Sequence, residues 1–201
     1  MSRFPLGLTS MHPLVLASTS PARRALLEQV GLPFVAESPG VEEHLDPAAD
    51  PVAQARDLAL RKALAVAARH PDAIVVGADQ VLVLEGRALG KPRDEAEARA
   101  QLSAMSGATH ALVTGVAVVG GGRIWQGDEA TRLRVRALEP EEIEAYLSTG
   151  EWRGCAGGYR VEGRGLALFE SIEGDWTNVL GLPMPLLLGE LRRRGVPLFA
   201  P

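Results

Sequence analysis

Hydroxyl and guanidinium side chains gather in residues 14–27, where a short apolar run would pass into a helix. Ser18, Ser20, Arg23 and Arg24 carry hydrogen-bond donors that suit phosphate oxygens. The N-terminus of a helix adds unpaired N–H groups and a partial positive charge, so anions bind there readily. The segment therefore indicates an anion-binding cradle, although the same residues also fit a well-capped surface helix with two solvated arginines.

A carboxylate stands between two apolar runs in the middle of the chain. Asp79 follows residues 73–78 and precedes residues 81–84, so strand formation would bury it, and a buried carboxylate without a partner is costly. Residues 85–86 predict a hairpin turn that would bring Lys91 back toward Asp79. The pattern favours a site; the alternatives are a turn aspartate at a strand end and an ordinary surface lysine.

Cations and carboxylates together form the candidate chemical set. The cations would bind phosphate oxygens, and the carboxylates could bind a divalent ion or activate water. This combination suits metal-assisted attack on a phosphoanhydride, although the residue types do not say which bond breaks. The cations are Arg23, Arg24, Lys62 and Lys91, and the carboxylates are Glu42, Glu43 and Asp79.

Several familiar site motifs are absent from the sequence. Residues 86–92 have three residues between the glycines and a proline where a P-loop needs Ser or Thr, and the glycines of residues 154–165 do not open a helix after a strand. Neither a nucleophile elbow nor a zinc motif of the His-Glu-x-x-His type occurs. The four histidines stand in dispersed polar contexts, which predicts surface positions.

Composition restricts the class of protein. The formal net charge of −4 is modest and mixed along the chain, which argues against a nucleic-acid surface. The single cysteine, Cys155, excludes an internal disulfide and favours a reducing cytoplasm. No apolar run reaches the roughly 18 to 20 residues of a membrane span, so no membrane association is expected.

Periodicity and capping residues predict the strands and helices that would hold these side chains. Ser20 is a good N-cap and Pro21 fits a first helical turn, and Asp50 and Pro51 begin a long helix in the same way, with Lys62 inside it. Strands are predicted at residues 14–17, 34–37, 73–78, 81–84, 111–119, 124–125, 131–136 and 166–172, and helices at about 21–30, 51–70, 94–105, 139–149 and 182–194.

The order of these elements predicts the domain organisation. Residues 1–13 are expected to form a short flexible extension, and residues 14–201 a single α/β domain with two lobes around a cleft. The chain has 201 residues, of which 46% are hydrophobic and only 4% aromatic, so the core should consist mostly of Leu, Val and Ala.

The chain also contains seven short segments that form a recognisable set. They are residues 16–27 (LASTSPARRALL), 41–43 (VEE), 61–63 (RKA), 76–81 (VGADQV), 90–93 (GKPR), 155–159 (CAGGY) and 181–183 (GLP). In this order they resemble the Maf family of nucleoside triphosphate pyrophosphatases, over residues 14–194. The resemblance implies an inosine-triphosphatase-like fold, with a mixed twisted sheet flanked by helices around a cleft.

The resemblance also implies an activity and its requirements. Members hydrolyse a nucleoside triphosphate to the monophosphate and diphosphate, with a divalent metal cation (Mg²⁺ or Mn²⁺) and usually as a homodimer. The family is thought to keep noncanonical nucleotides out of nucleic acids and is associated with inhibition of septum formation. Carried over by position, the resemblance assigns the general base to Asp79, phosphate binding to Arg23, Lys62 and Lys91, the cradle hydroxyl to Ser18, and the acidic residue near the metal to Glu43. Whether Asp79 acts as base or as metal ligand stays open.

Three positions bear on the choice of nucleotide. The subfamily that acts on dTTP and UTP tends to have Arg, Thr and Gln there, and the one that acts on 7-methyl-GTP tends to have Trp, Gln and Glu. This chain has Ala22, Gln80 and Glu162, so two of the three match the second pattern. Since a glutamate accepts hydrogen bonds from the N1–H and 2-amino groups of guanine, we expect a preference for 7-methyl-GTP, with dTTP and UTP as the alternative.

A protein of another class could share part of this pattern. A non-catalytic nucleotide-binding regulator of septum formation would keep the anion cradle but would not need Asp79 together with Glu43 and a metal. The sequence retains all of these residues, which favours an enzyme.

Overall fold

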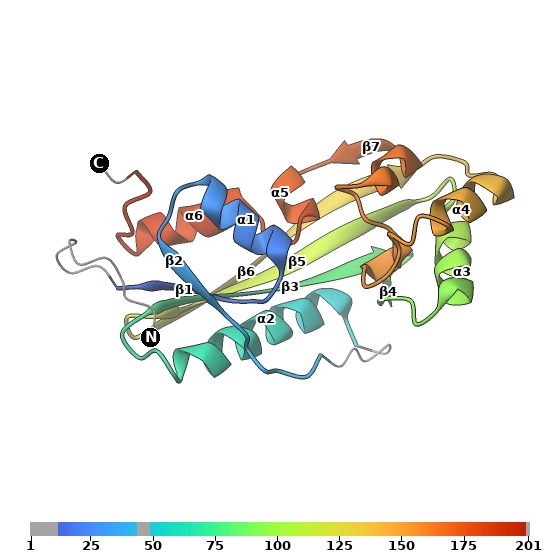
Figure 1. Cartoon of the computed structure of the whole chain (residues 1–201). Coiled ribbons are helices and arrows are strands. Elements are labelled where there is room, and N and C mark those ends of the chain that lie inside the picture. The colour runs from blue at the N-terminus through green and yellow to red at the C-terminus, as the bar shows by residue number, and fades with distance from the viewer. Residues whose placement is uncertain (1–11, 44–48, 200–201) are drawn as a thin grey trace.

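A computed structural model describes residues 12–43 and 49–199 of the chain (Figure 1). Most of the predicted N-terminal extension therefore lies outside the described residues. A seven-stranded sheet has the order β2-β1-β3-β5-β6-β7, with β4 paired to β3. Its strands are β1 (Leu14–Ala17), β2 (Phe34–Glu37), β3 (Ile74–Leu84), β4 (Arg87–Leu89), β5 (Thr109–Gly120), β6 (Arg123–Val135) and β7 (Phe169–Glu173).

Helices cover both faces of the sheet, so the predicted α/β class is confirmed. They are α1 (Pro21–Gln29), α2 (Pro51–Ala67), α3 (Glu95–Met105), α4 (Pro140–Leu147), α5 (Trp176–Val179) and α6 (Met184–Arg193), with two short 3₁₀ segments at Ala156–Gly158 and Arg164–Leu168. Strands β1, β2 and β3 are parallel, whereas β3, β5, β6 and β7 pair in antiparallel fashion, which makes the sheet mixed.

The parallel strands are joined by helices on opposite faces. Helix α1 packs Leu26 and Leu27 with α6 on one face, and α2 packs Ala59 and Ala63 on the other (Figure 1). A separate core lies toward the far end of β3 and β5, where α3, α4 and the 3₁₀ segments gather. Strands β3, β5 and β6 therefore connect two packed regions, as the expected two-lobed domain requires.

One edge of β3 is unpaired between these two regions. Strand β1 pairs with β3 only as far as Val76, and β4 pairs with it only from Leu82 onward. Asp79 and Gln80 lie on the intervening stretch. Because successive side chains of a strand point to opposite faces, Asp79 lies on the α2 face and Gln80 on the opposite one.

Two glycines allow α2 to approach the sheet closely. A Cβ at Gly77 would lie 2.2 Å from the Ala59 carbonyl oxygen, and one at Gly115 would lie 2.5 Å from the Ala55 carbonyl oxygen. Real Cβ atoms do not come so close to backbone, so only glycine permits this packing. The close approach brings Lys62, on the buried face of α2, within reach of β3.

Several sequence-based expectations need correction. Residues 74–84 form one continuous strand that includes Asp79 and Gln80, not two separate strands at 73–78 and 81–84, because β5 pairs with this strand from Val75 to Val83. Residues 166–172, predicted as a core strand, divide into a 3₁₀ segment and the partly exposed edge strand β7. Helix α5 had no strong periodic signal, since it is only four residues long.

The prediction of surface histidines is wrong for His110. His110 is only 2% exposed, and its Nε2 lies 2.8 Å from the Tyr159 hydroxyl oxygen. Burial lowers the pKa of His110 to about 4, so the ring is neutral at pH 7 and is tolerated in the core. Among the helices of residues 12–43 and 49–199, none is long and apolar enough to cross a membrane.

The packing of α2 generates a stability prediction. Replacing Gly77 by Ala should lower the free energy of unfolding by about 1–3 kcal/mol or more, because the new methyl group must displace the α2 backbone. Gly189→Ala in α6 is the matched control, since a Cβ there meets nothing within 4 Å and should stabilise the helix by up to about 1 kcal/mol. Urea unfolding followed by circular dichroism measures both. Equal stability of the two variants would contradict the proposed packing.

Candidate active site

A cavity of about 490 Å³ opens beside the unpaired edge of β3. Its size suits a nucleotide-sized ligand. Its walls come from the turn between β1 and α1, the segment before α2, α2 itself, β3 and the glycine-rich segment after α4. The cavity brings together these residues singled out from the sequence: Ser18, Ser20, Ala22, Arg23, Glu43, Lys62, Asp79, Gln80, Lys91 and Glu162.

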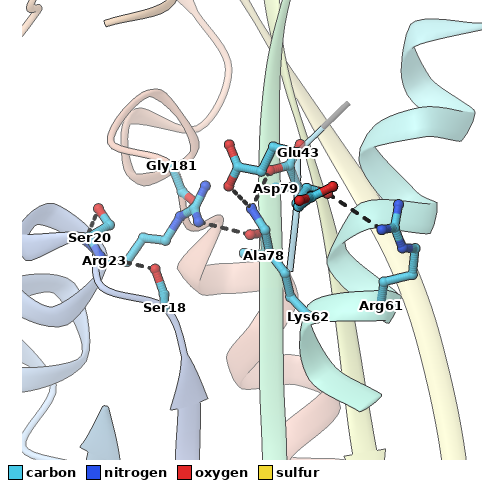
Figure 2. A network of polar contacts seen from close by, with 10 residues as sticks. Ser18, Ser20, Arg23, Glu43, Arg61, Lys62, Ala78, Asp79 and Gly181 are labelled. Atoms are coloured by element: carbon cyan, nitrogen blue, oxygen red, sulfur yellow. Dashed lines mark hydrogen bonds and ion pairs between the residues drawn. The ribbon is translucent and has the colours of Figure 1, made fainter. Parts of the chain in front are cut away.

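The Lys62 ammonium joins the two acidic residues of the cavity. Lys62 Nζ donates to Asp79 Oδ1 at 2.7 Å and to Glu43 Oε1 at 2.5 Å (Figure 2). The Lys62 side chain is 5% exposed and that of Asp79 is 10% exposed, whereas Glu43 is half exposed. A buried ammonium needs opposite charge and hydrogen bonds around it, and the two carboxylates provide both.

The sequence identified Asp79 as a group that requires a partner but pointed to Lys91 as that partner. The structure gives the direct contact to Lys62 instead, and Lys91 lies in the cavity wall. The reason is the close packing of α2, which no local sequence pattern reveals.

The balance between burial and nearby positive charge differs for the two carboxyl groups. It raises the pKa of Asp79 above its ordinary value, and the charges of Lys62 and Arg23 only partly oppose this. Burial also pushes the pKa of Glu43 upward, but the hydrogen bond and charge of Lys62 outweigh it, so the pKa of Glu43 lies below its ordinary value. The difference follows from depth, because Asp79 is far less exposed than Glu43. Asp79 is thus the more proton-attracting of the pair.

Arg23 spans the cavity from α1 to β3. Its Nε donates to the Gly181 carbonyl at 2.7 Å, and its Nη1 donates to the Ala78 carbonyl at 2.8 Å (Figure 2). Ala78 lies on the unpaired edge of β3, so the guanidinium takes the place of a missing strand partner. Burial lowers the pKa of Arg23, while the negative charges of Asp79 and Glu43 oppose this. A guanidinium has five N–H donors, so three remain for a ligand.

The start of α1 forms the second anion-binding element. Ser20 is its N-cap and accepts from the Arg23 backbone N–H at 3.4 Å, and Pro21 occupies the first turn, as predicted. The buried Ser18 Oγ accepts from the Ser20 backbone N–H at 3.1 Å, which leaves its own O–H free to donate. Because residues 20–22 line the cavity, the positive end of the α1 dipole faces it.

Two of the candidate residues lie outside the cavity. Arg24 points away from it, pairs with Glu28 at 2.8 Å and has a side chain that is 62% exposed. Helical geometry turns neighbouring side chains by about 100°, so Arg23 and Arg24 cannot both face the ligand. Glu42 is exposed, and its backbone carbonyl accepts from Arg61.

Some residues of the cavity wall were assigned no site role from the sequence. Arg160 and Cys155 both line it, from the glycine-rich segment that also carries Glu162. The proximity of Arg160 to Glu162 in the sequence was the available signal. Thr19, between the two cradle serines, also lines the wall.

The donor set is compatible with a divalent cation. Lys62 contacts only one oxygen of each carboxylate, and no described residue donates to Asp79 Oδ2 or Glu43 Oε2. Mg²⁺ is commonly held by one or two carboxylates together with water and substrate phosphates. Within the described ranges, no group of three or more His, Cys, Asp or Glu residues is placed to hold a metal. Phosphate oxygens of a substrate would therefore complete such a site.

Comparison with known proteins gives a consistent result. The model of the family described as "Maf-like protein" matches residues 13–194. The chain is 47% identical to a dTTP/UTP pyrophosphatase of Symbiobacterium thermophilum over 189 residues, which cover 94% of this chain and 97% of that protein. It is 46% identical to a 7-methyl-GTP pyrophosphatase of Xanthomonas axonopodis pv. citri over 186 residues, covering 92% and 98% of the two chains.

A third relative, a dTTP/UTP pyrophosphatase of Deinococcus radiodurans, is 44% identical over 186 residues, which cover 92% of this chain and 95% of that one. The match to the family model extends over nearly the whole domain that contains the cavity. On these grounds the chain belongs to the Maf family.

Proposed function

We propose that this chain, a nucleotide pyrophosphatase of the Maf family, hydrolyses a nucleoside triphosphate to the monophosphate and diphosphate in the cavity beside β3. The observation that carries the proposal is the meeting of two sets of groups in one cavity. Anion-binding donors lie on one side, and the ion-paired group of the buried Lys62 and Asp79 with the half-exposed Glu43 lies on the other. Hydrolysis of a phosphoanhydride needs both charge neutralisation and a proton acceptor.

The cations and the helix terminus bind the phosphate chain. Arg23 offers its three remaining N–H donors, Lys91 adds a second positive charge, and the N-terminus of α1 with Ser18 adds neutral donors. The Arg23 guanidinium is held by two backbone carbonyls before the substrate arrives, so it is placed to stabilise the negative charge that develops as the phosphoanhydride breaks.

Asp79 accepts the proton of the attacking water. Its burial raises its pKa, which strengthens it as a base, and the hydrogen bond from Lys62 orients it. In this account the main role of Lys62 is to position the two carboxylates, because its ammonium already donates a hydrogen bond to each.

The carboxylate of Glu43 would hold a divalent cation, Mg²⁺ or Mn²⁺, together with that of Asp79 where Asp79 acts as a ligand and not as the base. When bound, the cation supplies positive charge beside the phosphates and lowers the barrier to attack on phosphorus. Glu43 suits this role because its pKa lies below the ordinary value, so it is ionised at pH 7.

The nucleotide we favour is 7-methyl-GTP, because the base end of the cavity carries an acceptor. Glu162 lines the cavity and can accept from the N1–H and 2-amino groups of a guanine, and its charge attracts the cationic 7-methylated ring. Ala22 contributes neither a guanidinium nor a stacking surface. The relatives do not decide the matter, since 47% and 46% identity go with the two different names. Hydrolysis of dTTP and UTP is therefore the second candidate.

The remaining parts of the proposal follow the family resemblance. The enzyme would act as a homodimer in the cytoplasm, where Cys155 stays reduced. By removing a noncanonical nucleotide it would limit the entry of that nucleotide into nucleic acid, with a link to the arrest of cell division.

Release of diphosphate from a panel of nucleotides tests this function. We expect release from 7-methyl-GTP with Mg²⁺ or Mn²⁺, and a kcat/KM for it about tenfold or more above those for GTP, ATP and CTP. A higher kcat/KM for dTTP or UTP than for 7-methyl-GTP would contradict the choice of nucleotide but not the proposed activity. Absence of diphosphate release from every nucleotide would contradict the proposed activity and favour a binding regulator.

Two neighbouring arginines provide a matched test of phosphate binding. Arg23→Ala should lower kcat/KM by roughly 100-fold or more, because a guanidinium that two carbonyls hold at the cavity, where it would bind the phosphates, is lost. Arg24→Ala should change kcat/KM by less than about twofold, since this side chain is exposed and lies outside the cavity. Steady-state kinetics measure both. Equal losses in the two variants would rule out the distinction that the geometry makes.

A further inference from the structure

The side-chain amide of Gln80 is fixed by two acceptors that the mechanism above does not use. Gln80 Nε2 donates to Thr114 Oγ1 at 3.1 Å and to the backbone carbonyl of Asn178 at 2.6 Å. Thr114 is also the residue paired with Gln80 across β3 and β5. Both N–H groups of the amide are therefore directed away from the cavity, into the fold.

These contacts determine the orientation of the amide. A backbone carbonyl can only accept a hydrogen bond, so the group that faces Asn178 must be the NH₂ and not the oxygen. The oxygen, Oε1, accepts no hydrogen bond from any residue in the described ranges, and Gln80 lines the cavity. Oε1 is thus the polar atom of this side chain that remains for a ligand.

The two acceptors are themselves rigidly held. Thr114 and Asn178 are both 0% exposed. Asn178 Nδ2 donates to the Leu112 carbonyl at 2.9 Å and to Thr131 Oγ1 at 3.0 Å, so α5 is tied to β5 and β6 at the point where it receives Gln80. A buried network of this kind resists reorientation, because each broken bond would leave an unpaired polar group.

We propose that Thr114 and Asn178 are positioning residues for nucleotide choice, which hold Gln80 so that only an acceptor faces the base. Together with the Glu162 carboxylate, this gives the base end of the cavity two acceptors, and it selects a base whose facing edge carries N–H donors. The inference rests on the proposed function, because it concerns the base of the nucleotide that is hydrolysed.

Thr114→Val tests the inference, with Thr114→Ser as the matched control. Valine keeps the shape but removes the acceptor, so one amide N–H of Gln80 loses its buried partner and only the Asn178 carbonyl still holds the amide. The amide can then turn and present this N–H to the cavity. The ratio of kcat/KM for 7-methyl-GTP to that for UTP should then fall by about tenfold, since UTP presents acceptors that 7-methyl-GTP lacks at the same edge. Thr114→Ser retains the hydroxyl and should leave the ratio within about twofold of its original value.

A purely structural role would have a different signature. If Thr114→Val left the ratio unchanged, lowered both kcat/KM values by the same factor, or was matched by Thr114→Ser, the positioning role would be overturned. The ratio is defined whichever nucleotide the unmodified enzyme prefers, so its change is separable from the base assignment. If no nucleotide is hydrolysed at all, the proposed function fails, and the same ratio taken from dissociation constants measured by calorimetry decides the positioning role.

Discussion

The ammonium of Lys62, held between Asp79 and Glu43, is the interaction on which the rest of the site depends. Lys62 and Asp79 are buried and Glu43 is half exposed, so removal of either buried charge would leave the other without its full compensation. The arrangement is possible because Gly77 and Gly115 let the α2 backbone lie against β3 and β5. The packing of one helix thus sets the position of the carboxylates, and through them the place where water and phosphate meet.

The unpaired edge of β3 is the second constraint. A gap between the partners β1 and β4 exposes the strand to the cavity, and Arg23 occupies part of the gap by binding the Ala78 carbonyl. Asp79 and Gln80 are adjacent in sequence but lie on opposite faces of the strand. In this account Asp79 acts on one face of the strand, and the nucleobase is recognised on the other. Substitutions at Gln80 or its partners can therefore alter nucleotide choice without moving Asp79, the proton acceptor.

The sequence predicted the parts of the site that depend on local chemistry. Ser20 and Pro21 identify the start of α1, and the position of Asp79 between apolar runs identifies it as a buried group that needs a cation. Contacts over long sequence separations were not predictable: the pairing of Lys62 with Asp79 depends on how α2 packs, and the contact of Gln80 with the Asn178 carbonyl depends on how α5 packs. The sequence also grouped Arg24 with Arg23 as a phosphate-binding residue, although the two side chains point in different directions from α1 and Arg24 lies outside the cavity.

Replacement of Asp79 by Asn tests the central claim most directly, because it removes the proposed base and keeps the shape of the side chain. We predict that kcat falls by about 1,000-fold, whereas the dissociation constant for a non-hydrolysable nucleotide analogue changes by less than about threefold. Loss of kcat with retained binding, measured by diphosphate release and calorimetry on the same preparation, would support a proton acceptor at Asp79. A kcat within about tenfold of the unmodified enzyme would contradict the assignment.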